Sequence, residues 1–318
     1  MKNVKKMFVY LLVLSALAGF CTPVWAETET SDAGAATFEV IEGELLPPIK
    51  GHYDYHPELA EFTVKRLTVE GIPLYEVYRD DGEKKPLVFF LHGGGGNKAD
   101  IIGLLSDLAY DMARAGFYCV AIDCAGSGDS QIGPIDSIPA FAMTVSQIDT
   151  LIEYYATIPQ ADEEHFGLTG VSMGANISFA YVVYGKYQPT IICGEMGTPD
   201  YTTLAKRPLY DCFDHGRNGC PNVMTREEIL DFAREYSPIN HPEKFLDVYI
   251  YEGNGTADDQ TGPEGCMALE SFLNEAGGTK HVFNYYEGLR HGEHSPDYHL
   301  IEALRQALLN DNTVSIFQ

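Results

Sequence analysis

The amino-acid sequence predicts an α/β fold in which a mostly parallel central sheet carries helices on both faces. From residue 86 onward, short apolar runs alternate with longer stretches whose apolar residues recur at helical spacing, which is typical of strands joined by crossover helices. Runs such as residues 87–91 are apolar at every position, as in strands that are buried on both faces. A chain of 318 residues with 45% hydrophobic composition can also bury one large core.

The individual elements follow from these patterns in chain order. An antiparallel hairpin is predicted first, because two β-rich runs flank the turn sequence Glu70-Gly71-Ile72-Pro73. The predicted strands span residues 62–69, 74–78, 87–91, 117–122, 165–171, 190–193, 248–251 and 281–286, and the predicted helices span residues 101–115, 141–158, 173–184, 226–236, 262–276 and 296–309. Right-handed crossovers are expected between the parallel strands.

Prolines interrupt this rhythm between residues 199 and 244. The segment contains Pro208, Pro221, Pro238 and Pro242 and one amphipathic helical stretch, residues 226–236. Proline cannot continue a helix interior or a central strand. We interpret residues 199–244 as a small cap insertion within one domain that spans residues 61–312.

The first 26 residues have the pattern of an export signal. A lysine-rich start is followed by the apolar stretch 7–20, and small residues precede a cleavage point after Ala26. We therefore predict secretion or release to an extracytoplasmic compartment, with residues 27–60 as a flexible leader and N-terminal extension. A lipoprotein signal at Cys21 and an uncleaved membrane anchor are alternatives, but Phe20 is large for the first and the apolar stretch is short for the second.

Charge and cysteine content restrict the expected partners. The chain has 21 Lys and Arg residues against 46 Asp and Glu residues, and its formal net charge is −25. This charge argues against nucleic acid and anionic membrane surfaces as partners. Cys212 and Cys220, which bracket a polar loop, are the best candidate disulfide pair, whereas Cys119 lies in an apolar strand and is expected to be a buried free thiol.

One serine lies at a predicted strand-to-helix turn. The sequence Gly170-Val171-Ser172-Met173-Gly174 separates the strand 165–171 from the helix 173–184. This pentapeptide is a weak signal alone, but in this context it is typical of a nucleophile elbow. The elbow exposes a hydroxyl where a histidine can remove its proton. Ser172 is therefore the candidate nucleophile.

A glycine-rich loop follows the strand 87–91. The run His92-Gly93-Gly94-Gly95-Gly96 lets backbone N–H groups approach a developing oxyanion without a Cβ in the way. We assign one oxyanion donor to Gly94, with Gly93 possible, and the other to Met173, the residue after the nucleophile. A phosphate-binding loop is the alternative, but no Lys-Ser or Lys-Thr pair follows the glycines. His92 is expected to order this loop, and Asp123 is expected to anchor the loop after the strand 117–122.

The remaining candidates follow the last two predicted strands. Asp258 is the candidate acid that orients the histidine, with Asp259 as runner-up and an Asx-turn as the structural alternative. His291 is the candidate general base, because it lies just after the end of the predicted strand 281–286. His294 is the second candidate base.

A metal site formed by His291, Glu293, His294 and His299 is an alternative interpretation of the same segment. The spacing matches none of the zinc-binding arrangements in which two histidines flank a glutamate on one helix. We expect neither a metal nor a cofactor.

These motifs together resemble the α/β-hydrolase superfamily, and within it the short bacterial serine esterases similar to prolyl oligopeptidases and dienelactone hydrolases. The resemblance covers residues 62–309. It implies Ser172 as nucleophile, His291 as base and Asp258 as acid, with oxyanion donors at Met173 and at Gly94 or Gly93. The dienelactone hydrolases proper use cysteine as nucleophile, and the sequence contains no large propeller of the kind found in true prolyl oligopeptidases.

The expected activity is hydrolysis of carboxylic esters through an acyl-enzyme, with small-molecule or carbohydrate esters such as acetyl or aryl esters as substrates. Two alternatives stay open. One is an aminopeptidase or dipeptidase that uses the same three residues, and the other is a catalytically silent binding protein with a hydrolase fold.

Overall fold

The computed structural model describes residues 36–43, 61–104, 106–130, 138–204, 225–293 and 299–317. The chain divides into two compact units, residues 1–37 and 38–318, and the fold reported below belongs to the second. The predicted signal segment, Cys212 with Cys220, and His294 lie outside the described residues. No helix in the described ranges is long and apolar enough to cross a membrane.

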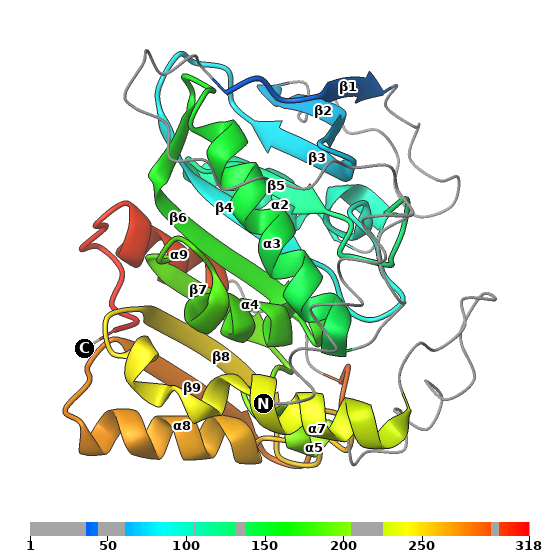
Figure 1. Ribbon diagram of the computed structural model, residues 1–318. Coiled ribbons are helices and arrows are strands. Elements are labelled where there is room, and N and C mark those ends of the chain that lie inside the picture. The colour runs from blue at the N-terminus through cyan, green and yellow to red at the C-terminus, as the bar shows by residue number, and fades with distance from the viewer. Residues whose placement is uncertain are drawn as a thin grey trace, which may run out of the picture. The chain divides into compact units, whose positions relative to one another are not determined.

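A nine-stranded mixed sheet runs through the described part of the chain in the order β1-β2-β3-β5-β4-β6-β7-β8-β9 (Figure 1). The strands are β1 (Val40–Gly43), β2 (Thr63–Val69), β3 (Ile72–Tyr78), β4 (Lys85–Leu91), β5 (Tyr118–Ile122), β6 (Ala161–Val171), β7 (Ile191–Glu195), β8 (Tyr249–Gly255) and β9 (His281–Tyr286). The first three strands pair antiparallel, and β3 joins β5 antiparallel. From β5 to β9 all pairs are parallel. The carboxyl ends of β4 to β9 therefore meet at one edge of the sheet.

Helices cover both faces of this sheet. One face carries α3 (Ile138–Tyr155), α4 (Met173–Tyr184) and α8 (Glu264–Glu275), and the other carries α2 (Leu108–Ala115) and α9 (His299–Leu308) (Figure 1). The second face forms a buried cluster that includes Met112 of α2, Val88 of β4 and Leu304 of α9. On the first face α4 is the central helix, because its residues from Met173 to Val182 are all buried. This burial fixes the start of α4 against the sheet edge.

The predicted fold class is confirmed, including the antiparallel hairpin formed by β2 and β3. Two local differences have physical reasons. The predicted helix 101–115 is divided into the π-helical turn η2 (Asp100–Leu104) and α2. The sequence at the division contains Gly103, Ser106 and Asp107, which weaken a helix interior or compete for its backbone hydrogen bonds. The strand β1 was not predicted, since its four residues gain their order by pairing with β2.

The segment after β7 holds short helices that pack on α4. These are α5 (Tyr201–Leu204), α7 (Arg226–Tyr236), η5 (Pro238–Asn240) and η6 (Pro242–Phe245). Thr225 and Glu228 form a reciprocal capping box at the start of α7. The ring of Tyr236 stacks on Tyr184 of α4 with 4.1 Å between centroids, and the hydroxyl of Tyr201 donates to the carbonyl of Asn176 at 2.6 Å.

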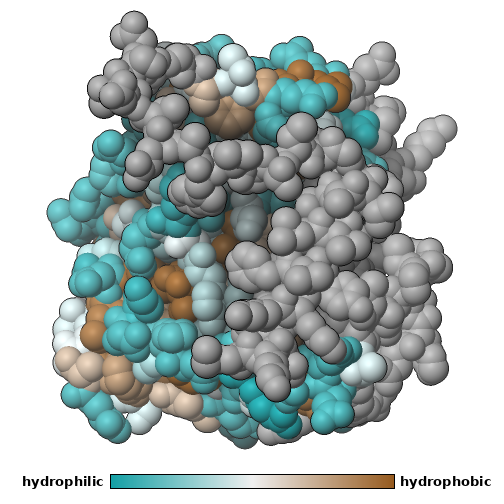
Figure 2. Space-filling model, in the orientation of Figure 1, coloured by the Kyte–Doolittle hydropathy of each residue, from teal (hydrophilic) through white to brown (hydrophobic). Residues whose placement is uncertain are grey.

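The surface of the described residues is mixed on the face shown in Figure 2. Hydrophilic residues surround smaller apolar patches, and the patch at the top lies over β1, where Val40 and Ile41 are exposed. The described cysteines, Cys119, Cys124, Cys193 and Cys266, are buried free thiols.

Candidate active site

Ser172 lies in a strained turn between β6 and α4. Its backbone has φ 54° and ψ −110°, a conformation that costs a non-glycine residue free energy and concentrates at functional sites. Two glycines make the turn possible. A Cβ on Gly174 would lie 1.8 Å from the carbonyl oxygen of Leu91, and a Cβ on Gly170 would lie 2.5 Å from the carbonyl carbon of Gly174. The N–H of Ser172 donates to the carbonyl of Glu195 at 2.8 Å, so the turn is also fixed to β7.

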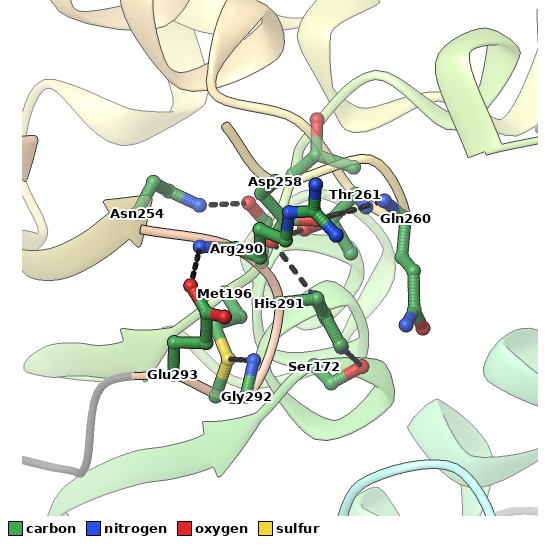
Figure 3. Close-up of polar contacts among 12 residues, drawn as sticks. Ser172, Met196, Asn254, Asp258, Gln260, Thr261, Arg290, His291, Gly292 and Glu293 are labelled. Carbon is green, nitrogen blue, oxygen red and sulfur yellow. Dashed lines mark hydrogen bonds and ion pairs between the residues drawn. The ribbon is translucent and has the colours of Figure 1, made fainter. Parts of the chain in front are cut away.

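Three side chains that are distant in sequence form one hydrogen-bonded chain at the sheet edge (Figure 3). His291 Nε2 lies 2.9 Å from Ser172 Oγ, and His291 Nδ1 lies 2.8 Å from Asp258 Oδ2. A carboxylate can only accept, so Nδ1 carries the proton and Nε2 faces the serine hydroxyl as an acceptor. The side chain of His291 is 13% exposed and that of Asp258 is 0% exposed. The structure therefore brings the predicted serine, histidine and aspartate together in the required order.

Asp258, not Asp259, is the carboxylate that meets the histidine. Besides His291 it accepts hydrogen bonds from the N–H of Gln260 at 2.8 Å, the N–H of Thr261 at 3.0 Å and the hydroxyl of Thr261 at 2.8 Å, whereas Asp259 is exposed. Burial of Asp258 raises its pKa, but the bonds from His291 and Thr261 outweigh burial and hold the pKa well below its usual range. The local turn and the contact with His291 thus converge on one buried carboxylate.

The loop that carries His291 is held by backbone contacts on both sides. The N–H of Ala257 donates to the carbonyl of Leu289 at 3.0 Å, and a Cβ on Gly255 would lie 2.2 Å from that same carbonyl oxygen. On the other side, the N–H of Gly292 donates to the thioether sulfur of Met196. Met196 has a positive φ of 61° and was not identified from the sequence. Its contact depends on two loops that only the fold brings together.

The glycine loop lies directly against the elbow. A Cβ on Gly93 would lie 3.8 Å from Ser172 Cβ and 3.5 Å from the carbonyl oxygen of Val171. The buried ring of His92 orders this loop: its Nε2 accepts from the N–H of Cys124 at 3.1 Å, so its Nδ1 donates to the carbonyl of Gly93 at 2.8 Å. Met173 begins α4 directly after Ser172, so its N–H belongs to the free donors at a helix N-terminus. The predicted donors Gly93, Gly94 and Met173 therefore come from the two segments that flank the serine.

A buried glutamate lies on β8, the strand that precedes the loop of Asp258. Glu252 is 2% exposed, and its Oε1 accepts from the N–H of Gly197 at 2.7 Å. Burial raises the pKa of Glu252 well above its usual range, and the charge of Glu195 raises it further, although the bond from Gly197 opposes the shift. The folded protein therefore favours the protonated, neutral carboxyl of Glu252.

Substitution of Glu252 by Gln should increase stability at alkaline pH. A carboxyl whose pKa is higher in the folded than in the unfolded state binds more protons when folded, so stability falls as the pH rises above the unfolded value. Glutamine resembles the neutral acid and cannot ionise. We expect the urea midpoint of Glu252→Gln to equal that of the wild type near pH 4.5 and to be higher than that of the wild type at pH 8. The exposed control Glu287→Gln should change neither midpoint, and a variant that is equally destabilised at both pH values would contradict this account.

Among the residues that the structure describes, no group of three or more His, Cys, Asp and Glu side chains could hold a metal ion. Of the alternative metal set, His291 contacts Ser172 and Asp258, Glu293 accepts from the N–H of Arg290, and His299 contacts Glu302.

Known proteins that are similar to this chain share its fold. The family model described as serine aminopeptidase, S33, matches residues 82–198, which contain the glycine loop and the serine turn. No curated protein matches the chain. The chain has the α/β-hydrolase fold and resembles the serine hydrolases of that superfamily.

Solved structures show the same fold. Acetyl xylan esterase 1 from Thermoanaerobacterium is 18% identical with a TM-score of 0.59, over 86% of this chain and 87% of that chain. The acylaminoacyl peptidase of Pyrococcus horikoshii is 17% identical with a TM-score of 0.54, and the match covers 73% of this chain. A putative dipeptidyl aminopeptidase IV from Bacteroides ovatus is 15% identical with a TM-score of 0.57, over 86% of this chain. The match spans only 38% and 36% of these two peptidases.

Proposed function

We propose that this protein is a serine hydrolase that cleaves carboxylic esters through an acyl-enzyme. The observation that carries the proposal is the continuous hydrogen-bonded chain from Asp258 through His291 to Ser172. A serine hydroxyl is a weak nucleophile, and a neutral imidazole within 2.9 Å is positioned to take its proton. The glycine loop against the same serine supports an acyl-transfer reaction, in which negative charge develops on a carbonyl oxygen.

In the acylation step Ser172 Oγ attacks the ester carbonyl while His291 Nε2 accepts the hydroxyl proton. The resulting oxyanion receives hydrogen bonds from the N–H of Met173 and from that of Gly94 or Gly93. Collapse of this intermediate breaks the bond to the alcohol, which leaves with the proton from His291. Asp258 keeps the imidazole in the correct tautomer and stabilises its positive charge.

In the deacylation step a water molecule takes the place of the alcohol. His291 accepts a proton from this water, whose oxygen attacks the acyl carbon, and then returns the proton to Ser172 as the acid product leaves. The protein supplies every acid, base and hydrogen-bond donor in both steps. No added cofactor is required by this scheme.

Acetyl or aryl esters of carbohydrates are the substrate class that we propose. The acetyl xylan esterase matches this chain over 86% of its length and is itself covered to 87%, whereas the peptidase matches leave most of those proteins unmatched. Esters also need less assistance than amides, because an alkoxide or phenoxide can leave with little protonation, whereas the nitrogen of an amide must be protonated before it leaves as an amine.

Replacement of Ser172 by Ala should abolish hydrolysis of p-nitrophenyl acetate. The variant loses the nucleophile, so we expect kcat/KM to fall by about 10⁴-fold or more, with an unchanged thermal unfolding midpoint. The control is Ser178→Ala, which should keep its activity. Ser178 is a buried serine in α4, the helix that follows Ser172, and its hydroxyl donates to the carbonyl of Gly174. Full activity in the Ser172 variant would overturn the proposal.

Peptide hydrolysis is the second candidate function, because the matching family model is described as a serine aminopeptidase. Both reactions use the same three residues, but an amine needs stronger protonation as it leaves. Purified protein should be tested on an alanine p-nitrophenyl ester and on alanine p-nitroanilide. A preference for the ester above about 10³-fold supports the esterase, and comparable rates support the peptidase.

We also propose that the protein is exported with cleavage after Ala26. The lysine-rich start and the apolar stretch 7–20 support this. Mass spectrometry of the protein recovered from a secreting host should show Glu27 as the first residue. A chain that retains residue 1 would argue for the anchored alternative.

A further inference from the structure

The glycine loop is tied at both ends to a single turn that follows β5. At its start, His92 accepts from the N–H of Cys124. At its end, the N–H of Lys98 donates to Asp123 Oδ1 at 2.8 Å, and the ammonium of Lys98 donates to Asp123 Oδ2 at 2.6 Å. Residues 92–98 are therefore held between two fixed points on the neighbouring strand end.

The lysine end of this attachment is a buried ion pair. The side chain of Lys98 is 5% exposed and that of Asp123 is 0% exposed. The ammonium also contacts Asp129 Oδ2 at 2.7 Å and lies 5.7 Å from the centroid of the Tyr75 ring. Such pairs contribute little net stability, because desolvation offsets their attraction, but they resist rearrangement, since moving one partner leaves an uncompensated charge.

The turn after β5 is built around the carboxylate of Asp123. Its Oδ2 accepts from the N–H of Asp129 at 2.7 Å, and a Cβ on Gly128 would lie 2.3 Å from Asp123 Cγ. Gly128 also has a positive φ of 54°. The turn thus closes tightly over the carboxylate that receives both donors of Lys98.

We propose that Lys98 is a positioning residue for catalysis: its ion pair with Asp123 holds the glycine loop where Gly93 or Gly94 can donate to the oxyanion. This inference rests on the proposed function. Lys98 acts through the loop, because the loop is tied to Asp123 at one end and lies close to Ser172 at Gly93, where an added Cβ would be 3.8 Å from Ser172 Cβ. Donors that act on the oxyanion affect the transition state more than the bound ester.

Substitution of Lys98 by Met should therefore lower kcat and leave KM nearly unchanged. We expect a fall in kcat for p-nitrophenyl acetate of about 10- to 100-fold, which is less than the loss of a whole oxyanion donor, with KM within about threefold. Inhibition by benzeneboronic acid, which forms a tetrahedral adduct on an active serine, should weaken by the same factor as kcat.

Lys85 provides a matched control on the strand that precedes the glycine loop. Its side chain is also buried, at 6% exposed, and is also paired with an aspartate, Asp81. Lys85 lies at the opposite end of β4 from the glycine loop. Lys85→Met should reduce stability while kcat of the folded enzyme stays unchanged. Equal kcat losses in the two variants, or an unchanged kcat in folded Lys98→Met, would overturn the inference.

Asp129→Asn keeps the test decisive if Lys98→Met does not fold. Asp129 is 57% exposed and supplies only one of the two carboxylates at the ammonium, so this variant should fold. We expect its kcat to fall about two- to fivefold at constant KM, and an unchanged kcat would again overturn the inference. Failure of the proposed function would look different, because the wild-type protein itself would then neither hydrolyse esters nor react with a fluorophosphonate at Ser172.

Discussion

Asp258→Asn is expected to reduce kcat/KM for p-nitrophenyl acetate by about 10⁴-fold, because the amide can present an N–H to His291 and favour the wrong imidazole tautomer. The carboxylate of Asp258 accepts from His291 Nδ1 at 2.8 Å and is shielded from solvent. The amide group of asparagine has nearly the same size, so the fold should be retained. Steady-state kinetics with a circular dichroism spectrum provides the measurement.

Asp259→Asn is the control for this prediction. The two aspartates are adjacent and were both candidates from the sequence, but Asp259 is exposed and makes no hydrogen bond to His291 in the described part of the chain. Its variant should keep kcat/KM within about twofold of the wild type. A large loss at Asp259, or activity retained at Asp258, would show that the carboxylate has been assigned incorrectly.

Gly174→Ala is expected to destabilise the protein by about 3 kcal/mol or more, because overpacking a buried site forces backbone shifts. The new Cβ would lie 1.8 Å from the carbonyl oxygen of Leu91, the last residue of β4. Neither the strand end nor the helix start can move without displacing Ser172 or His92. For a domain of this size, such a loss lowers the unfolding midpoint by roughly 6–12 °C.

Gly277→Ala separates the steric effect from backbone strain. Gly277 has a positive φ of 76°, but a Cβ added there would meet no heavy atom within 4 Å, so only the conformational cost of about 1 kcal/mol applies. Differential scanning fluorimetry of both variants gives the comparison. Equal destabilisation at the two positions would show that the contact between α4 and β4 does not restrict Gly174.

Most of the fold could be predicted because the sequence carries local signals for it. Buried parallel strands leave continuous apolar runs, and the candidate residues, from the loop at His92 to His291, were located by their positions after the predicted strands. These signals depend on residues that are close in sequence, which is why they can be recognised in one chain.

The supporting contacts could not be predicted, because they join segments that are distant in sequence. Lys98 follows β4 and binds Asp123, which follows the neighbouring strand β5. Met196 and Gly292 are separated by 96 positions in the sequence. In the sequence, Lys98 resembles any surface lysine and Met196 any core methionine. The choice between Asp258 and Asp259 likewise required the turn at Thr261, whose hydroxyl and N–H fix the orientation of one carboxylate.

Reaction with a fluorophosphonate probe tests most directly whether Ser172 is an activated nucleophile. The probe forms a bond to a serine oxygen only when a neighbouring base withdraws its proton and donors stabilise the developing charge. Peptide mass spectrometry should locate one label on Ser172 in the wild type, and His291→Ala should remove it. A folded wild-type protein that stays unlabelled, or that carries its label on a different serine, would contradict the account.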